Sequence, residues 1–132
     1  MKHTEHKFQV QVARLLDASG LLWTAIPNGG KRSAITGAIL KAEGVKAGFP
    51  DVAILEPFHI WGEAKACGFV SRSFHFSGVF IELKNGKAGR VSPAQKEWIE
   101  ALRKRGYRAE VARTMDEVLD LLHECYPNKI TK

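Results

Sequence analysis

The sequence has little cysteine and lacks any long apolar run, and each shortage excludes a class of protein. The two cysteines, Cys67 and Cys125, are far apart and belong to no C-x-x-C pair, so neither a disulfide scaffold nor a zinc ribbon is indicated. No uninterrupted apolar stretch approaches the roughly 18 residues that a membrane span requires, and the N-terminal residues contain no apolar signal core. We therefore expect a cytoplasmic protein with reduced thiols and no membrane partner.

Acidic residues are also in the minority. Against 14 Asp and Glu stand 20 Lys and Arg, which gives a formal net charge of +6 over 132 residues. This excess favours a polyanionic partner, with nucleic acid before an anionic membrane surface. The length is that of one ordinary domain and allows a core to form without a disulfide or metal staple. Because the sequence has no internal repeat or linker, residues 1–132 are expected to form a single domain.

Apolar periodicity and turn signals predict eight elements of secondary structure. Helices are expected over about 4–19, 33–43, 92–106 and from 114 onward, and strands over 21–26, 51–55, 79–84 and 107–112. The order α-β-α-β-β-α-β-α indicates an α/β fold of the α+β kind, in which a mixed sheet is flanked by helices on both faces. The segment 56–78 has no readable periodicity and could form a hairpin or a dimer contact.

Two carboxylates and an amine are predicted to meet in this sheet. Asp51 starts one buried strand, and Glu82 and Lys84 share one face at the end of the next strand. If these strands pair antiparallel, the two carboxylates lie about 5 Å apart and repel each other unless a cation lies between them. A hard divalent ion, Mg²⁺ or Mn²⁺, meets that need, with the carbonyl of Leu83 as a further oxygen ligand. Lys84 could then hold or deprotonate an attacking water. The alternative is a turn cap at Asp51 and a solvated strand edge at Glu82 and Lys84.

Two further side chains have both a structural and a functional interpretation. Glu5 continues the apolar stripe of the first helix towards the protein, but an acid in a first turn is also favoured by the helix dipole. Gln95 completes a capping box with Ser92. It also precedes the inward face of its helix, where an amide could orient a water or a phosphate.

Basic side chains in two turns offer contacts to phosphate. The turn 27–32 combines backbone amides with two cations, and a second basic turn follows Lys84. Either turn could equally be a plain loop with solvated charges. The candidates for holding a nucleic-acid backbone are Asn28, Lys31, Arg32, Lys87 and Arg90.

Four motifs, taken in order, resemble those of a known family. They are Ile26-Pro27-Asn28, Gly48-Phe49-Pro50-Asp51, Phe80-Ile81-Glu82-Leu83-Lys84 and Ser92-Pro93-Ala94-Gln95. Together with an acid in the first helix, they resemble the VRR-NUC (virus-type replication-repair nuclease) family of the PD-(D/E)xK nuclease superfamily, in its short stand-alone phage and bacterial form. The likeness runs from Glu5 to about Ala112. The segment 56–78 departs from it, because it is longer and more aromatic than the family's usual connection.

The resemblance implies a restriction-endonuclease-like core and a DNA endonuclease that depends on Mg²⁺ or Mn²⁺, without a small-molecule cofactor. It implies metal ligation by Asp51 and Glu82 with assistance from Glu5, a catalytic lysine at Lys84, and Gln95 lining the site. It also implies branched DNA such as four-way (Holliday) junctions as the substrate, a homodimer, and a bacterial or phage-infected cell as the location. Two other functions stay open, namely a sequence-specific restriction-type endonuclease and a DNA-binding module without catalysis.

Overall fold

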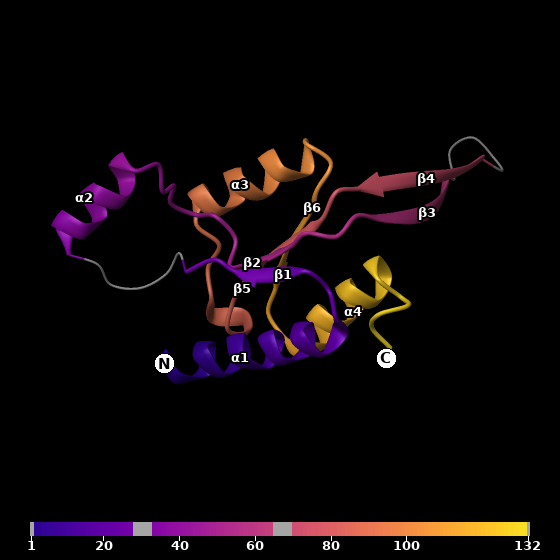
Figure 1. The fold of residues 1–132 in the computed structure, drawn as a ribbon, viewed down its shortest axis with the longest axis horizontal. Helices are drawn as coiled ribbons and strands as arrows, with labels where there is room; N and C mark the ends of the chain where they lie inside the picture. Colours follow the sequence, from indigo (N-terminus) through magenta and orange to yellow (C-terminus); the bar gives the residue numbers. More distant parts are fainter. Residues whose placement is uncertain (1, 28–32, 65–69, 132) are drawn as a thin grey trace.

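The centre of the molecule is a four-stranded sheet, seen in a computed structural model that describes residues 2–27, 33–64 and 70–131 (Figure 1). In spatial order the strands are β1 (Trp23–Ala25), β2 (Val52–Ile54), β5 (Val79–Leu83) and β6 (Arg108–Ala112). Strands β1 and β5 both pair antiparallel with β2, whereas β6 pairs parallel with β5. The sheet is therefore mixed, as the sequence predicted.

Helices cover both faces of this sheet. Figure 1 shows α1 (Lys2–Ser19) and α4 (Met115–Cys125) on one side of the sheet and α3 (Pro93–Arg103) on the other. This layering confirms the predicted fold class of a mixed sheet flanked by helices. It also means that the central strands are buried from two directions.

The two faces of the central strands build two cores. Val52 and Ile81, both fully buried, point into the larger core under α1 and α4. Ala53 and Phe80 point the other way, into a smaller core against Leu102 of α3. Each fully buried aliphatic or aromatic side chain contributes roughly 1.5–3 kcal/mol to folding. Because both faces are covered, a charged residue within β5 is held away from bulk water.

The segment 56–78 forms a hairpin, which the predicted element order does not include. Strand β3 (Phe58–Ala64) pairs antiparallel with β4 (Val70–Phe76) in a separate two-stranded sheet, and in Figure 1 this hairpin extends away from the body. At its base the rings of Phe58 and Phe76 stack with centroids 5.0 Å apart, and Phe58 meets the edge of Tyr126 beyond α4. The hairpin is therefore anchored on the larger core.

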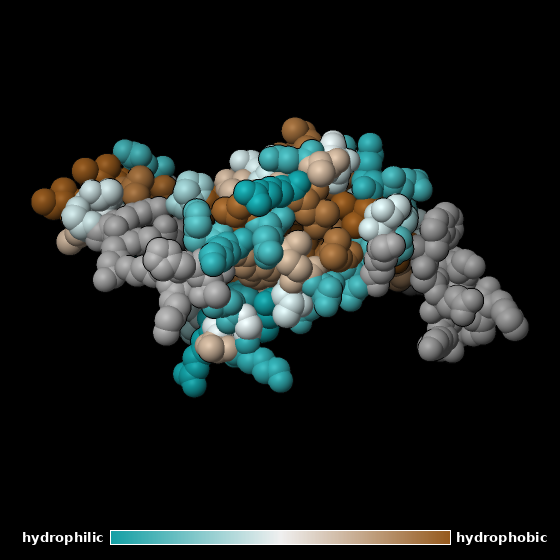
Figure 2. Space-filling model, turned by 90° about the horizontal axis from the view of Figure 1, so that it is seen from below, coloured by the Kyte–Doolittle hydropathy of each residue, from teal (hydrophilic) through white to brown (hydrophobic). Residues whose placement is uncertain are grey.

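Helix α2 (Ala34–Ala42) also extends away from the body of the molecule (Figure 1). Ser33 caps its N-terminus by accepting a hydrogen bond from the Thr36 N–H. None of its residues is buried, although the helix is apolar, and the exposed fractions of Ile35 and Ile39 are 76% and 52%. Figure 2 shows this end of the molecule with a brown, apolar surface.

Two expectations from composition can be compared with the described residues. Cys125 is a free thiol, and burial raises its pKa to about 12; Cys67 lies outside the described residues. No helix within the described ranges has the length and apolarity needed to cross a bilayer.

Candidate active site

The pairing of β2 with β5 brings the two predicted acids to one end of the sheet. The pairing is antiparallel, and Val52 lies opposite Ile81. The next position outward therefore places Asp51, just before β2, opposite Glu82 near the end of β5. The two carboxyl groups are close enough to share a hydrogen bond, and this hydrogen bond is one of the causes that raise the pKa of Glu82.

Asp51 is fixed by both its backbone and its side chain. Its carbonyl accepts a hydrogen bond of 2.7 Å from the Ile26 N–H. Its carboxylate oxygen Oδ2 accepts one of 2.8 Å from the Leu83 N–H, across to the end of β5. The carboxylate is thereby held beside the last residue of β5, the strand that carries Glu82. Its position does not depend on a ligand.

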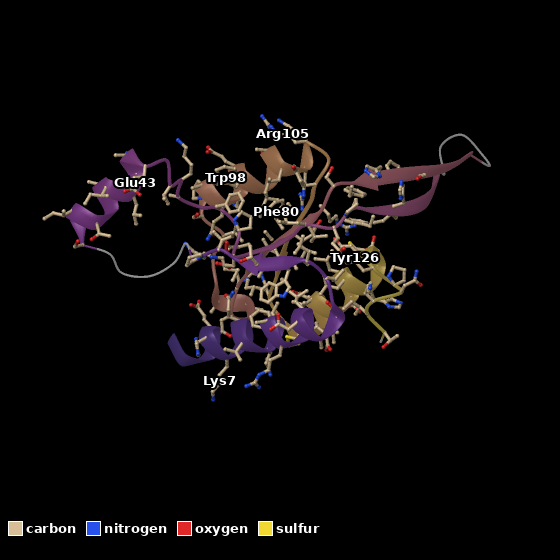
Figure 3. All side chains as sticks on the ribbon, in the orientation of Figure 1. Lys7, Glu43, Phe80, Trp98, Arg105 and Tyr126 are labelled. Atoms are coloured by element: carbon tan, nitrogen blue, oxygen red, sulfur yellow. The ribbon has the colours of Figure 1, made fainter. Side chains whose placement is uncertain are left out.

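The loop before Asp51 is packed against α3. The Phe49 ring makes edge contacts with Phe80 and Trp98, at centroid distances of 5.5 Å and 4.9 Å, and Figure 3 shows the latter two side chains in the layer between the sheet and α3. Gly48 has φ of +88°, and a Cβ there would lie 2.7 Å from the backbone carbon of Ala94. Only glycine combines this backbone conformation with so close an approach to α3.

Glu82 is a charged group in an apolar setting. Its exposed fraction is 3%, and among the described residues it is the only charged or polar one classed as buried. Its pKa is raised from 4.5 to about 8, mainly by burial and further by the nearby Asp51 and Glu5, against the lowering effect of Lys84. In the absence of a cation, the protein therefore favours the protonated form of Glu82.

Lys84 and Gln95 are the polar neighbours of Glu82. The Lys84 Nζ lies 3.9 Å from the Glu82 Oε2. The Gln95 Nε2 donates to the same oxygen at 3.4 Å, while its Oε1 accepts from the Ser92 N–H at 2.9 Å and completes a capping box at the start of α3. One amide thus both caps the helix and contacts the acid, whereas its role towards a water or a phosphate stays a prediction.

These groups surround a cavity of about 850 Å³ at the end of the sheet. Glu5, an exposed residue in the first turn of α1, lies on its rim. The structure therefore brings the five predicted catalytic residues to one cavity. The sequence interpretation missed His6, Gln9 and Asn85, which also line it. Two signals in the sequence could have indicated Gln9 and Asn85. Gln9 lies one helical turn after Glu5, and Asn85 directly follows Lys84.

The predicted DNA-binding residues divide into two groups. Lys87 and Arg90 line a second cavity of about 470 Å³, beside the end of β5 that carries Lys84. Asn28, Lys31 and Arg32 lie outside the described residues.

The donor set of the large cavity fits a divalent cation. Asp51 and Glu82 offer two hard carboxylates, and Leu83 also lines the cavity. Burial and mutual repulsion destabilise these two charges unless a cation or a proton compensates them. Within the described ranges there is no group of three or more His, Cys, Asp or Glu that could hold a metal, so Glu5 does not form one with this pair. Mg²⁺ needs only one or two carboxylates, because it keeps several waters.

A Pro-Asp at the start of one strand and a Glu-x-Lys at the end of its antiparallel neighbour is the arrangement of a PD-(D/E)xK nuclease. Comparisons with known proteins agree with this class. The VRR-NUC domain matches residues 3–116 of the sequence. A solved structure described as a VRR_NUC domain protein has 28% sequence identity and a TM-score of 0.65, over 94% of this chain and 88% of that chain. No curated protein matches the chain.

The chain therefore belongs to the VRR-NUC domain family. As such it is a nuclease domain of the PD-(D/E)xK type, an enzyme that acts on DNA.

Proposed function

We propose that this chain is a divalent-metal-dependent endonuclease that hydrolyses phosphodiester bonds in branched DNA, with four-way junctions as the leading substrate. The observation that carries the proposal is the buried Glu82 carboxylate, which lies beside Asp51 and 3.9 Å from an ammonium group in an open cavity. A structural ion pair does not account for this set, because one ammonium cannot balance two neighbouring acids.

Asp51 and Glu82 would hold the ion, with the carbonyl of Leu83 as a third oxygen donor. When bound, the ion supplies Lewis-acid polarisation of the scissile phosphate and helps to ionise the attacking water. The contribution of the chain is to keep both carboxylates in place before the ligand arrives. The hydrogen bond from the Leu83 N–H fixes Asp51, and the Gln95 amide holds Glu82.

Lys84 has the role of orienting the reacting groups. Its ammonium group is on the same side of the strand as Glu82, and only 16% of the side chain is exposed. From this position it can donate to the attacking water or to a phosphate oxygen as negative charge develops. Glu5, on the rim, can accept a hydrogen bond from a water at the ion.

A homodimer is part of the proposal. Two opposed cuts across a four-way junction need two active sites related by a two-fold axis. The apolar α2 supports such an assembly, because Ile35 and Ile39 are exposed on a helix with no buried residue. Contiguous exposed apolar surface of this kind is typical of an interface.

The test is cleavage of a labelled four-way junction and of linear duplexes of the same arm sequences, with Mg²⁺, with Mn²⁺ and with EDTA. We expect cutting of the junction with either metal and none with EDTA. Lys84→Met should reduce the rate by about 10²–10⁴-fold, whereas Lys104→Met, on the exposed end of α3, should not. Equal cutting by the Lys84 variant and the wild type would contradict the mechanism.

The same assay separates the alternatives. Cutting at one sequence in linear duplex, with the junction ignored, would identify a restriction-type enzyme. DNA binding without cutting under any metal condition would identify a binding module.

A further inference from the structure

The second cavity is a basic cavity built by the turn after β5, the start of α3 and a residue that follows β6. It has a volume of about 470 Å³. Its lining contains no acid and four cationic side chains, which are those of Lys87, Arg90, Lys96 and Arg113. Gly89 and Val91 complete the lining. One of these cations, Arg113, is distant in sequence from the basic turn.

Arg113 organises the cavity wall. Its Nη1 donates to the carbonyl oxygens of Gly86 and Gly89, at 2.8 Å and 2.5 Å. The guanidinium thereby fixes both ends of the 3-10 turn Gly86–Ala88, and with it the backbone that carries Lys87 and Arg90. Glu117 accepts from the backbone N–H of Arg113, so its carboxylate is directed to the main chain.

The other three cations have no acidic partner in the part of the chain that the structure describes. Within the described ranges, no salt bridge involves Lys87, Arg90 or Lys96, whereas Arg103 and Arg108 are paired with Glu110. Gathering four positive charges around one cavity raises the free energy of the folded chain unless an anion binds between them. An unbalanced set of this kind is typical of a site for a phosphate group.

The basic cavity adjoins the candidate active site. Gly89, in its lining, lies against the Lys84 side chain, because a Cβ on Gly89 would be 3.0 Å from the Cβ and 3.2 Å from the Cδ of Lys84. Lys84 also lines the larger cavity. One strand of DNA that places a phosphate at the acids can therefore place a neighbouring phosphate between these cations.

We propose that the basic cavity binds a backbone phosphate of the DNA strand being cut, next to the scissile phosphate, and so sets the position of the strand over Asp51 and Glu82. The inference rests on the proposed nuclease function. Such a contact positions the strand without reading bases. Lys96 and Arg90 donate to the non-bridging oxygens, and Arg113 keeps the turn in shape.

The first test is the salt dependence of DNA binding, measured in EDTA so that no cleavage occurs. Lys96→Gln removes a charge from the basic cavity, and Lys104→Gln removes an equal charge from the exposed end of the same helix. We expect Lys96→Gln to weaken binding about three- to tenfold and to reduce the slope of log K against log salt by about 0.9. The control should change the slope much less. Equal slopes for the two variants would overturn the proposal, as would the absence of any DNA binding.

The second test asks whether the cavity contacts one particular phosphate. Neutral methylphosphonate groups are placed one at a time along the cleaved strand, and binding is measured for the wild type and for Lys96→Gln. With the wild type, one position beside the cut site should lose about tenfold in affinity. With Lys96→Gln, the same substitution should have little further effect. Losses that are independent and additive at that position would overturn the assignment.

These results are distinguishable from a failure of the proposed function. If the junction is never cut but the first test gives the expected difference in slope, the basic cavity binds phosphate in a protein without the proposed activity. If the junction is cut and Lys96→Gln behaves as Lys104→Gln does, the nuclease function stands and the phosphate site does not.

Discussion

The buried Glu82 gives the sharpest prediction about stability in the absence of metal. We consider Glu82→Gln, which keeps the shape of the side chain and removes its charge. The Gln amide can donate a hydrogen bond towards Asp51, as the protonated carboxyl of Glu82 does. The substitution therefore mimics the protonated form of the acid at every pH.

The direction of the effect follows from the raised pKa. In the folded chain the pKa of Glu82 is about 8, against 4.5 when unperturbed, so the folded state holds this proton more tightly than the unfolded state does. The resulting stabilisation is fully present below pH 4.5 and is lost as the pH rises through about 8. The full shift would correspond to about 5 kcal/mol. Because Glu82 lines an open cavity, which lessens the cost of its charge, we expect roughly 2–3 kcal/mol.

The assay is urea-induced unfolding in EDTA at a series of pH values from 5 to 9. The wild type should lose stability relative to Glu82→Gln across this range, so that the variant is the more stable protein at pH 9. Because groups far from the site are the same in both proteins, the difference between the two unfolding free energies reports on Glu82 and the neighbours that interact with it. Glu43→Gln, at the exposed end of α2, is the matched control and should follow the wild type. A difference that stays constant from pH 5 to pH 9 would refute the electrostatic reasoning.

Three further predictions concern metal binding, backbone conformation and assembly. Mn²⁺ at about 100 times its Kd should raise the unfolding free energy of the wild type by about 2.7 kcal/mol, and Asp51→Asn should lose most of this gain; an unchanged gain, measured by thermal unfolding, would argue against Asp51 as a ligand. Gly48→Ala should destabilise the protein by at least 1–3 kcal/mol more than Gly44→Ala does in denaturant unfolding, because both glycines have positive φ but only Gly48 meets the backbone of α3; equal losses would contradict this packing. Ile39→Glu should convert a dimer to a monomer in light scattering, and a dimer that survives the substitution would place the interface elsewhere.

Local signals explain why much of the fold was predictable. The start of α3 follows from Ser92 and Gln95 alone, because a capping box is a contact between residues three apart. The antiparallel pairing of β2 with β5 was only a condition in the sequence interpretation, because a long connection between two buried runs allows either direction, and the structure shows that it is met. The two acids of the candidate site meet because they are part of this pairing, and their roles stay a prediction.

Features that depend on distant contacts were not predictable in this way. The hairpin β3–β4 is stabilised at its base by Phe58 against Tyr126, a residue more than sixty positions away, and no periodicity in either strand indicates this contact. The approach of Lys96 and Arg113 to the basic turn depends on where α3 and β6 lie in space. The exposure of Ile39 was not predictable because the local pattern is misleading: an apolar helix normally indicates burial.

Position 95, the third residue of α3, is occupied by Gln although Glu would complete the capping box equally well. Glu and Gln serve the third helical position of such a cap equally well, but here the same side chain also faces Glu82 through its Nε2. Glutamate would have no proton to offer and would bring a further negative charge to a place that already has two. At this position an amide is therefore a requirement of the neighbouring acids, and a glutamate there would weaken metal-free folding while leaving the helix itself intact.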